Sequence, residues 1–113
     1  MVHSAATDEV FHALSNPTRR KVLEHLSVGP ATVSELSARF DMQLPSFVQH
    51  LSILEQSRLV RSKKRGRVRT YEIVPQRFKP AEDWLVARRQ AWEGRLDRFD
   101  QYVKQLKDKE SKS

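Results

Sequence analysis

Uncharged hydrogen-bonding side chains share one face of a predicted helix near the middle of the chain. Ser46, Gln49 and Ser52 are three residues apart in the segment LPSFVQHLSILEQS. Their hydroxyl and amide groups can both donate and accept, as the edges of base pairs require. Exposed helix faces usually carry Glu and Lys, so this face favours contact with nucleic acid. An ordinary amphipathic helix whose outer face lacks charge is the alternative.

A cluster of cations follows that helix. Seven cations and no acid occur in the fourteen residues from Arg58 to Tyr71. The cations are Arg58, Arg61, Lys63, Lys64, Arg65, Arg67 and Arg69. Gly66 can adopt the positive φ of a tight turn, and the residues from Val68 to Val74 favour a strand. We predict a two-stranded hairpin, or wing, whose cations contact phosphate groups; a solvated basic loop is the alternative.

Two short helices precede the wing and must position these groups. Thr32 and Glu35 form a capping box for the first of them, whose buried side is Val33, Leu36 and Phe40. A turn over residues 41–43 leads to the second, with Pro45 at or near its first position. Its apolar stripe is Leu44, Phe47, Leu51 and Leu54. Two helices joined this closely predict a helix-turn-helix, in which the second helix enters the major groove.

The N-terminal part predicts two more helices. Thr7 is a plausible N-cap for a first helix over residues 7–15, with Val10, Phe11 and Leu14 on its apolar side. Asn16 followed by Pro17 marks the start of a second helix, which ends before Gly29.

A long helix is predicted over residues 78–106. Leu85, Trp92, Phe99 and Leu106 are seven residues apart, and Leu96 and Val103 fall between them. This a/d spacing is interrupted by Arg89 at one a position. So much apolar surface on so small a domain favours pairing across a two-fold axis, together with the first helix. A purely intramolecular strut is the alternative.

Composition sets limits on function. The 113 residues form a single predicted domain with a formal net charge of +7 and a pI near 10.1, which points to polyanionic partners. The absence of cysteine excludes disulfides, thiolate metal sites and cysteine nucleophiles, and it suits the cytoplasm. We expect no membrane association, because no apolar run approaches the ~18 residues needed to cross a bilayer and the N-terminus lacks the features of a secretion signal.

Three segments resemble the ArsR family of winged helix-turn-helix repressors. They are ALSNPTRRKVLEHL, TVSELSARFDMQLPSFVQHLSILEQSRLV and RGRVRTYEI. The likeness extends roughly from Asp8 to Val103 and is strongest to the subgroup with a long, Trp-containing C-terminal helix. It implies a homodimer that binds a palindromic operator and represses a nearby gene or its own operon.

The resemblance also assigns positions. The family's His-Leu pair corresponds to His50 and Leu51, and Gln49 stands where the family often reads the groove with Lys or Gln. Gln43 and Ser46 match the entry end of the helix, and Arg65, Gly66 and Arg67 match the wing tip. Val48 departs from the Ser common in the family, which weakens the expectation of a base contact there.

Metal-sensing members of the family use ligands that this chain lacks. Cysteine is absent, and no His follows Phe78, although Asp83, Asp97 and Asp100 lie in that region. The four histidines are His3, His12, His25 and His50. We expect His12 and His25 to be surface or packing residues, His50 to fix the recognition helix or touch a phosphate, and no metal or cofactor to be bound.

These observations combine into one prediction: a mainly α protein with a small β-hairpin, whose winged helix-turn-helix (residues 31–74) binds double-stranded DNA and which dimerises through its terminal helices. The predicted DNA-binding residues are Thr32, Ser34, Gln43, Ser46, Gln49, His50, Ser52, Lys63, Lys64, Arg65, Arg67 and Arg69. The predicted dimer interface is Val10, Phe11, Leu14, Leu85, Trp92, Leu96, Phe99, Val103 and Leu106.

Two other functions compete with DNA binding. A winged domain can serve as a protein-interaction module without reading DNA, but protein interfaces are depleted in Lys at their cores. An enzyme is disfavoured, because the sequence has no Gly-rich phosphate loop, no metal-ligand spacing and no nucleophile with an evident base. Trp84, Trp92, Phe99 and Tyr102 could line a small-molecule effector pocket between subunits, although a core or dimer-seam role is favoured.

Overall fold

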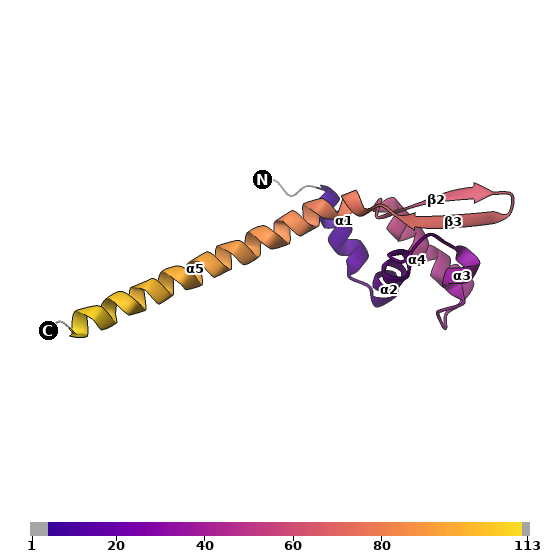
Figure 1. Cartoon of the computed structure of the whole chain (residues 1–113). Helices are drawn as coiled ribbons and strands as arrows, with labels where there is room; N and C mark the ends of the chain where they lie inside the picture. The colour runs from indigo at the N-terminus through magenta and orange to yellow at the C-terminus, as the bar shows by residue number, and fades with distance from the viewer. Residues whose placement is uncertain (1–4, 112–113) are drawn as a thin grey trace. The chain divides into compact units, whose positions relative to one another are not determined.

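The computed structural model describes residues 5–111 and divides into two compact units, Met1–Ala81 and Glu82–Ser113. The first contains most of the secondary structure, and the second is formed by the greater part of one long helix (Figure 1).

The first unit begins with helices α1 (Ala5–Leu14) and α2 (Pro17–Leu26). The predicted start of α2 is confirmed: the Asn16 side chain accepts a hydrogen bond from the Arg19 backbone N–H, and Pro17 is the first helical residue. The predicted N-cap of α1 is wrong, because the helix already includes Ala5 and the Thr7 side chain is buried within it.

Helices α3 (Val33–Ser37) and α4 (Leu44–Gln56) form the helix-turn-helix. The predicted capping box of α3 is present, with reciprocal hydrogen bonds between Thr32 and Glu35. This helix is shorter than predicted: Phe40 lies beyond its end but still packs against the core. Pro45 lies in the first turn of α4, as predicted. Leu44 is half-exposed, so it does not belong to the buried stripe.

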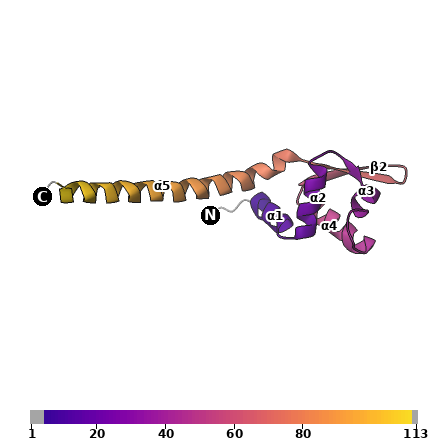
Figure 2. The ribbon, with the colours of Figure 1, turned by 60° about the horizontal axis from the view of Figure 1, so that its bottom comes forward.

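A three-stranded antiparallel sheet completes the first unit. Strands β2 (Val60–Arg65) and β3 (Val68–Ile73) form the predicted wing, and β1 (Ala31–Thr32) pairs with the other edge of β3 to give the order β1-β3-β2. In two views of the ribbon, the β2–β3 hairpin extends past α3 (Figures 1 and 2). No feature of the sequence predicted β1, which has only two residues.

One hydrophobic core holds these elements together. Helix α4 contributes three side chains that are fully buried, Phe47, Leu51 and Leu54. Helices α1, α2 and α3 add Val10, Val22, Leu26 and Leu36, the segment after α4 adds Leu59, and the wing adds Val60 and Tyr71. Because one face of α4 is inserted into this core, the opposite face must point to solvent.

A short 3₁₀ turn, η1 (Pro75–Phe78), leads into helix α5 (Lys79–Ser111). This helix has 33 residues and continues beyond the predicted end at Leu106. The sequence after Leu106 is polar, but its Lys and Glu residues are good helix formers. No helix in the described part of the chain combines the length and the apolar character that crossing a bilayer demands.

Candidate nucleic-acid interface

The exposed face of α4 carries uncharged polar groups. Ser46, Gln49 and Ser52 are all exposed, whereas the side chains of Phe47, Leu51 and Leu54 on the opposite face are fully buried. Gln43 is the N-cap residue, but its exposed side chain makes no capping hydrogen bond. The amide and hydroxyl groups of this face are therefore available to a ligand.

The end of α4 is fixed by a tight backbone motif. The N–H of Leu59 donates to the carbonyl of Leu54, and the N–H of Arg58 donates to that of Glu55. This is the Schellman pattern, and the buried Leu59 and Leu54 supply its hydrophobic contact. Arg58 has φ 65°, the left-handed conformation that glycine usually occupies in this motif. The motif turns the chain from α4 directly into β2.

The wing closes through a two-residue turn. Gly66 is the first turn residue and has φ 60°, as predicted from its freedom to adopt positive values. Strand pairing places Lys64 directly opposite Arg69. Like charges in this position repel and destabilise a hairpin.

The wing cations differ in their partners. Arg61 forms an ion pair with Glu72 of β3, and Arg69 donates to the Ser62 hydroxyl. Within the described residues, no ion pair or hydrogen bond holds the side chains of the remaining wing cations, Lys63, Lys64, Arg65 and Arg67. All four are exposed and lie at or near the turn, where they are free to meet phosphate groups.

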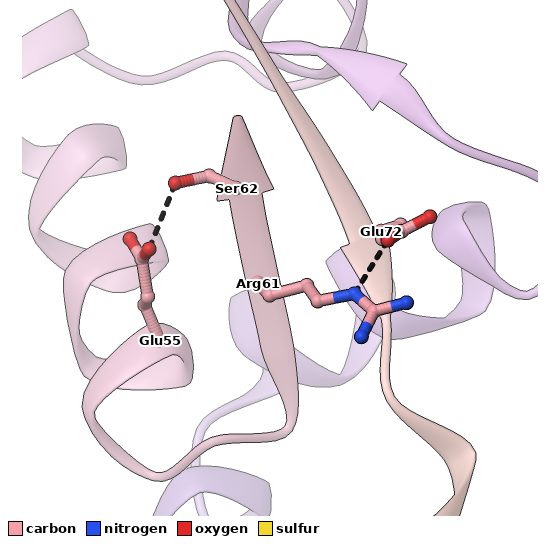
Figure 3. A network of polar contacts seen from close by, with 4 residues as sticks. All are labelled: Glu55, Arg61, Ser62 and Glu72. Atoms are coloured by element: carbon pink, nitrogen blue, oxygen red, sulfur yellow. Dashed lines mark hydrogen bonds and ion pairs between the residues drawn. The ribbon is translucent and has the colours of Figure 1, made fainter. Parts of the chain in front are cut away.

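A polar chain joins the wing to α4. The Ser62 hydroxyl donates to Glu55 in the last turns of α4 at 2.8 Å and accepts from Arg69 at 2.8 Å. Figure 3 shows Ser62 and Arg61 projecting to opposite sides of β2, the former toward Glu55 and the latter toward Glu72. Ser62 is paired with Tyr71, and burial, followed by the charge of Glu55, raises the pKa of that phenol. The network fixes the base of the wing against α4.

The amino end of α3 is occupied by its own cap. The Thr32 hydroxyl accepts from the Glu35 N–H, and the Glu35 carboxylate accepts from the Thr32 N–H. These hydrogen bonds lower the pKa of Glu35, and the bond from the Thr32 backbone has the larger effect. Ser34 is exposed beside them. Of the two residues predicted to contact DNA here, Ser34 has the more accessible hydroxyl.

The sequence did not reveal the importance of Arg19. Its side chain is only 5% exposed and reaches from α2 to the carbonyl groups at the end of α1 and to the ring of His50 on α4. His50 is partly buried. The only sequence signal for Arg19 is its position three residues after the cap Asn16, where it can fold back over the preceding helix end.

The other histidines lie apart from this surface or outside the described residues. His12 is exposed on α1, and His25 packs edge-on against Phe40 with ring centroids 5.9 Å apart. His3 falls outside residues 5–111. Among residues 5–111, no group of three or more His, Cys, Asp or Glu side chains is placed to hold a metal ion.

The predicted dimer residues fall into two groups. On α5, Leu85, Trp92, Leu96, Phe99 and Leu106 are between 44% and 62% exposed, and Val103 is partly exposed. On α1, Phe11 and Leu14 are partly buried against the core. Val10 is only 1% exposed and packs inside its own unit, so it is a core residue and has no surface to offer a second subunit.

Comparisons with known proteins agree with this architecture. Residues 14–63 match a family model described as a helix-turn-helix domain. The transcriptional repressor SdpR of Bacillus subtilis is 30% identical over 79 residues, which cover 70% of this chain and 88% of SdpR. The regulator Rv2034 of Mycobacterium tuberculosis is 37% identical over 68 residues, covering 60% of this chain and 64% of Rv2034.

Solved structures give the same result. The crystal structure of the ArsR family transcriptional regulator RHA00566 is 48% identical, covers 82% of this chain and 97% of its own, and superimposes with a TM-score of 0.76. An ArsR-like regulator from Rhodococcus sp. RHA1 is 29% identical, covers 86% and 92% of the two chains, and has a TM-score of 0.71. This chain therefore belongs to the ArsR family of winged helix-turn-helix transcriptional regulators.

Proposed function

We propose that the protein is a homodimeric repressor that binds a palindromic operator, with α4 in the major groove and the wing on the flanking phosphates. One observation carries the proposal: the uncharged polar face of α4 continues, through a rigid junction, into a hairpin with four cations that lack a partner in the described chain. SdpR is named a transcriptional repressor, and this similarity supports repression over activation. A repressor of this kind acts in the cytoplasm, on the DNA that it regulates.

The two parts of the surface have different roles in this proposal. Gln43, Ser46, Gln49 and Ser52 contact base edges or nearby phosphates, which sets sequence preference. Lys63, Lys64, Arg65 and Arg67 supply most of the affinity and its salt dependence by releasing counterions from the duplex. Arg69 shares in this field, but its guanidinium is also used to hold Ser62.

The dimer is proposed to form through the apolar seam of α5. Leu85, Trp92, Phe99 and Leu106 occupy d positions, and Leu96 and Val103 occupy a positions. Such a stripe on a helix of 33 residues is covered when a second copy of α5 packs against it. Phe11 and Leu14 of α1 provide a second, smaller apolar patch for the same interface.

Charges beside the seam favour a parallel pair. The central e positions are acidic (Glu93 and Asp100), and the preceding g positions are basic (Arg88 and Arg95). In a parallel coil, g faces e of the partner, which joins Arg88 to Glu93 and Arg95 to Asp100 of the second copy. An antiparallel pair would place acids against acids and bases against bases. Parallel pairing also keeps the two helix-turn-helix units at one end, where they can reach successive half-sites ~34 Å apart.

The proposal is tested by selecting duplexes from a random-sequence library with the full chain and then measuring affinity for the selected duplex and for a scrambled one. We expect one enriched, two-fold symmetric sequence that is bound at least about a thousandfold more tightly than the scrambled duplex. A protein-interaction module would enrich no sequence and would bind all duplexes weakly or not at all, even at low salt.

A further inference from the structure

Arg19 is a buried cation whose hydrogen bonds join three helices. Its Nε donates to the Ala13 carbonyl at 2.8 Å and its Nη2 to the His12 carbonyl at 3.0 Å, which satisfies the end of α1. Its remaining Nη1 lies 3.3 Å from Nδ1 of His50 on α4. A buried guanidinium keeps its charge, so each of these three partners must act as an acceptor.

This contact determines the protonation state of His50. Nδ1 accepts from Arg19 only when it carries no proton, so the neutral ring must carry its hydrogen on Nε2. A protonated ring would turn an N–H and a positive charge toward the guanidinium. In agreement, burial and then the charge of Arg19 lower the pKa of His50 below its ordinary value of 6.5.

His50 lies where its orientation affects the recognition surface. It is one residue after Gln49 and one helical turn after Ser46, on the flank between the buried and the exposed faces of α4. Any movement of α4 away from Arg19 therefore moves the groups proposed to read base edges. A displacement of about 1 Å is enough to weaken geometry-dependent contacts.

Other charged groups around α4 do not replace Arg19 in this role. Glu35 of α3 is held by Thr32, and Arg61 of β2 by Glu72. From α1, Glu9 and His12 line a hollow of about 190 Å³ beside Ile53 and Gln56 of α4. Arg19 is the charged group that contacts the His50 ring, and its charge, after burial, lowers the pKa of His50.

We propose that Arg19 is a positioning residue for DNA recognition: it holds α4 through neutral His50, so that protonation of His50 releases α4 and weakens operator binding. The inference rests on the proposed function. The inference predicts that operator affinity falls when His50 gains a proton. This direction is unusual, because adding positive charge to a DNA-binding surface ordinarily strengthens binding to the phosphate backbone.

The test compares wild type with His50→Asn and with His12→Asn, which replaces an exposed histidine on α1 and serves as the matched control. The asparagine Oδ1 is separated from Cβ by the same number of bonds as the histidine Nδ1 and can accept from Arg19 at every pH, so His50→Asn keeps the contact and removes the titration. Affinity for the selected duplex and for its scrambled counterpart is measured between about pH 8 and pH 5, the range in which histidine changes its charge.

We expect the ratio of specific to scrambled affinity to fall at acid pH by about fivefold or more in wild type and in His12→Asn, and to stay constant in His50→Asn. An equal pH profile in wild type and His50→Asn, or a ratio that rises on acidification in wild type, would overturn the inference. Arg19→Lys keeps the buried charge but carries all of its N–H donors on one nitrogen. It should therefore lower the ratio of specific to scrambled affinity at neutral pH while retaining the helix content.

Ring ¹⁵N shifts of His50 provide a readout that does not depend on DNA. We expect the Nε2–H tautomer in wild type at neutral pH and a mixture of tautomers in Arg19→Lys. The Nδ1–H tautomer in wild type would exclude the contact itself. Failure to bind any duplex at neutral pH, with the Nε2–H tautomer present, would instead reject the proposed function.

Discussion

Arg58 occupies a backbone conformation that suits glycine. Its φ of 65° places a side chain in the left-handed region at the end of α4, which costs about 1–2 kcal/mol, whereas glycine costs about 0.5–1 kcal/mol of additional chain entropy. We therefore predict that Arg58→Gly raises the free energy of unfolding by about 0.5–1 kcal/mol in urea titrations.

The control for this prediction is Arg58→Ala, which removes the same cation but keeps the Cβ and thus the strain. Alanine should give no comparable gain. Equal stabilisation by both substitutions would mean that charge repulsion, and not backbone strain, dominates at this position.

Lys64 and Arg69 face each other across the wing. Lys64→Glu converts this repulsion into attraction, so the hairpin should become more stable by roughly 0.2–1 kcal/mol. The same change should weaken DNA binding, because it replaces a cation that neutralises phosphate with an anion that repels it. Lys64→Gln, which only removes the charge, should fall between the two proteins in DNA affinity. Thermal unfolding and a binding titration measure the two effects, and the prediction is wrong if stability and affinity change in the same direction.

The roles of single residues were predicted well from sequence where they depend on neighbours within one helical turn. Asn16, Pro17, Thr32, Glu35 and Gly66 each act within three or four residues of themselves, and the structure confirms all five. Arg19 was missed because its role depends on His50, 31 residues away, and because arginine is usually a surface residue.

Side-chain hydrogen bonds hold the wing against α4. Ser62 joins Glu55 of α4 to Arg69 of β3. Replacing it with alanine removes both hydrogen bonds, so Ser62→Ala should cost about 0.5–1.5 kcal/mol and speed amide exchange in β2 and β3. Ser37→Ala, which removes only a hydrogen bond to Ser34 within α3, is the matched control and should leave exchange in the wing unchanged.

The wing and α4 should affect DNA binding differently. Replacing Arg65 and Arg67 with alanine should weaken binding to all duplexes and flatten the dependence of log affinity on log salt by about 0.9 for each phosphate that is no longer neutralised. Gln49→Ala should instead change the preference among operator variants with little effect on the salt slope. Binding titrations over a range of salt concentrations decide this. An unchanged slope in the wing variant would mean that the wing does not clamp phosphate.

The helices were predicted in order and type from their apolar periodicities and their start signals, and the wing was predicted from Gly66 and the strand propensity of the residues after it. Strand β1 escaped prediction because two residues carry no periodicity, and its existence depends on the register Ala31 with Tyr71 and Thr32 with Thr70, set about forty residues later. Helix α3 ends at Ser37 and not near Phe40, because Phe40 is drawn into packing with His25 and Phe47. Long-range contacts of this kind override local preference.

For the whole molecule, the orientation of the α5 pair is the main structural prediction. The chain has no cysteine, so a single Leu106→Cys substitution gives an unambiguous crosslink. In a parallel, in-register pair the two introduced thiols lie within disulfide distance, and mild oxidation should convert most of the protein to a covalent dimer. Lys104→Cys, on the outer side of the helix, should crosslink poorly. Equal, slow crosslinking of both variants would contradict the parallel arrangement.

The most direct test of DNA recognition by a dimer is hydroxyl-radical footprinting of the selected duplex, with the mass of the complex measured in the same solution. We predict two chains per duplex and two protected half-sites with centres about one helical turn, ~34 Å, apart. One chain per duplex with a single protected site, or no protection at any concentration that saturates binding, would contradict the claim that a dimer presents two copies of α4 to successive major grooves.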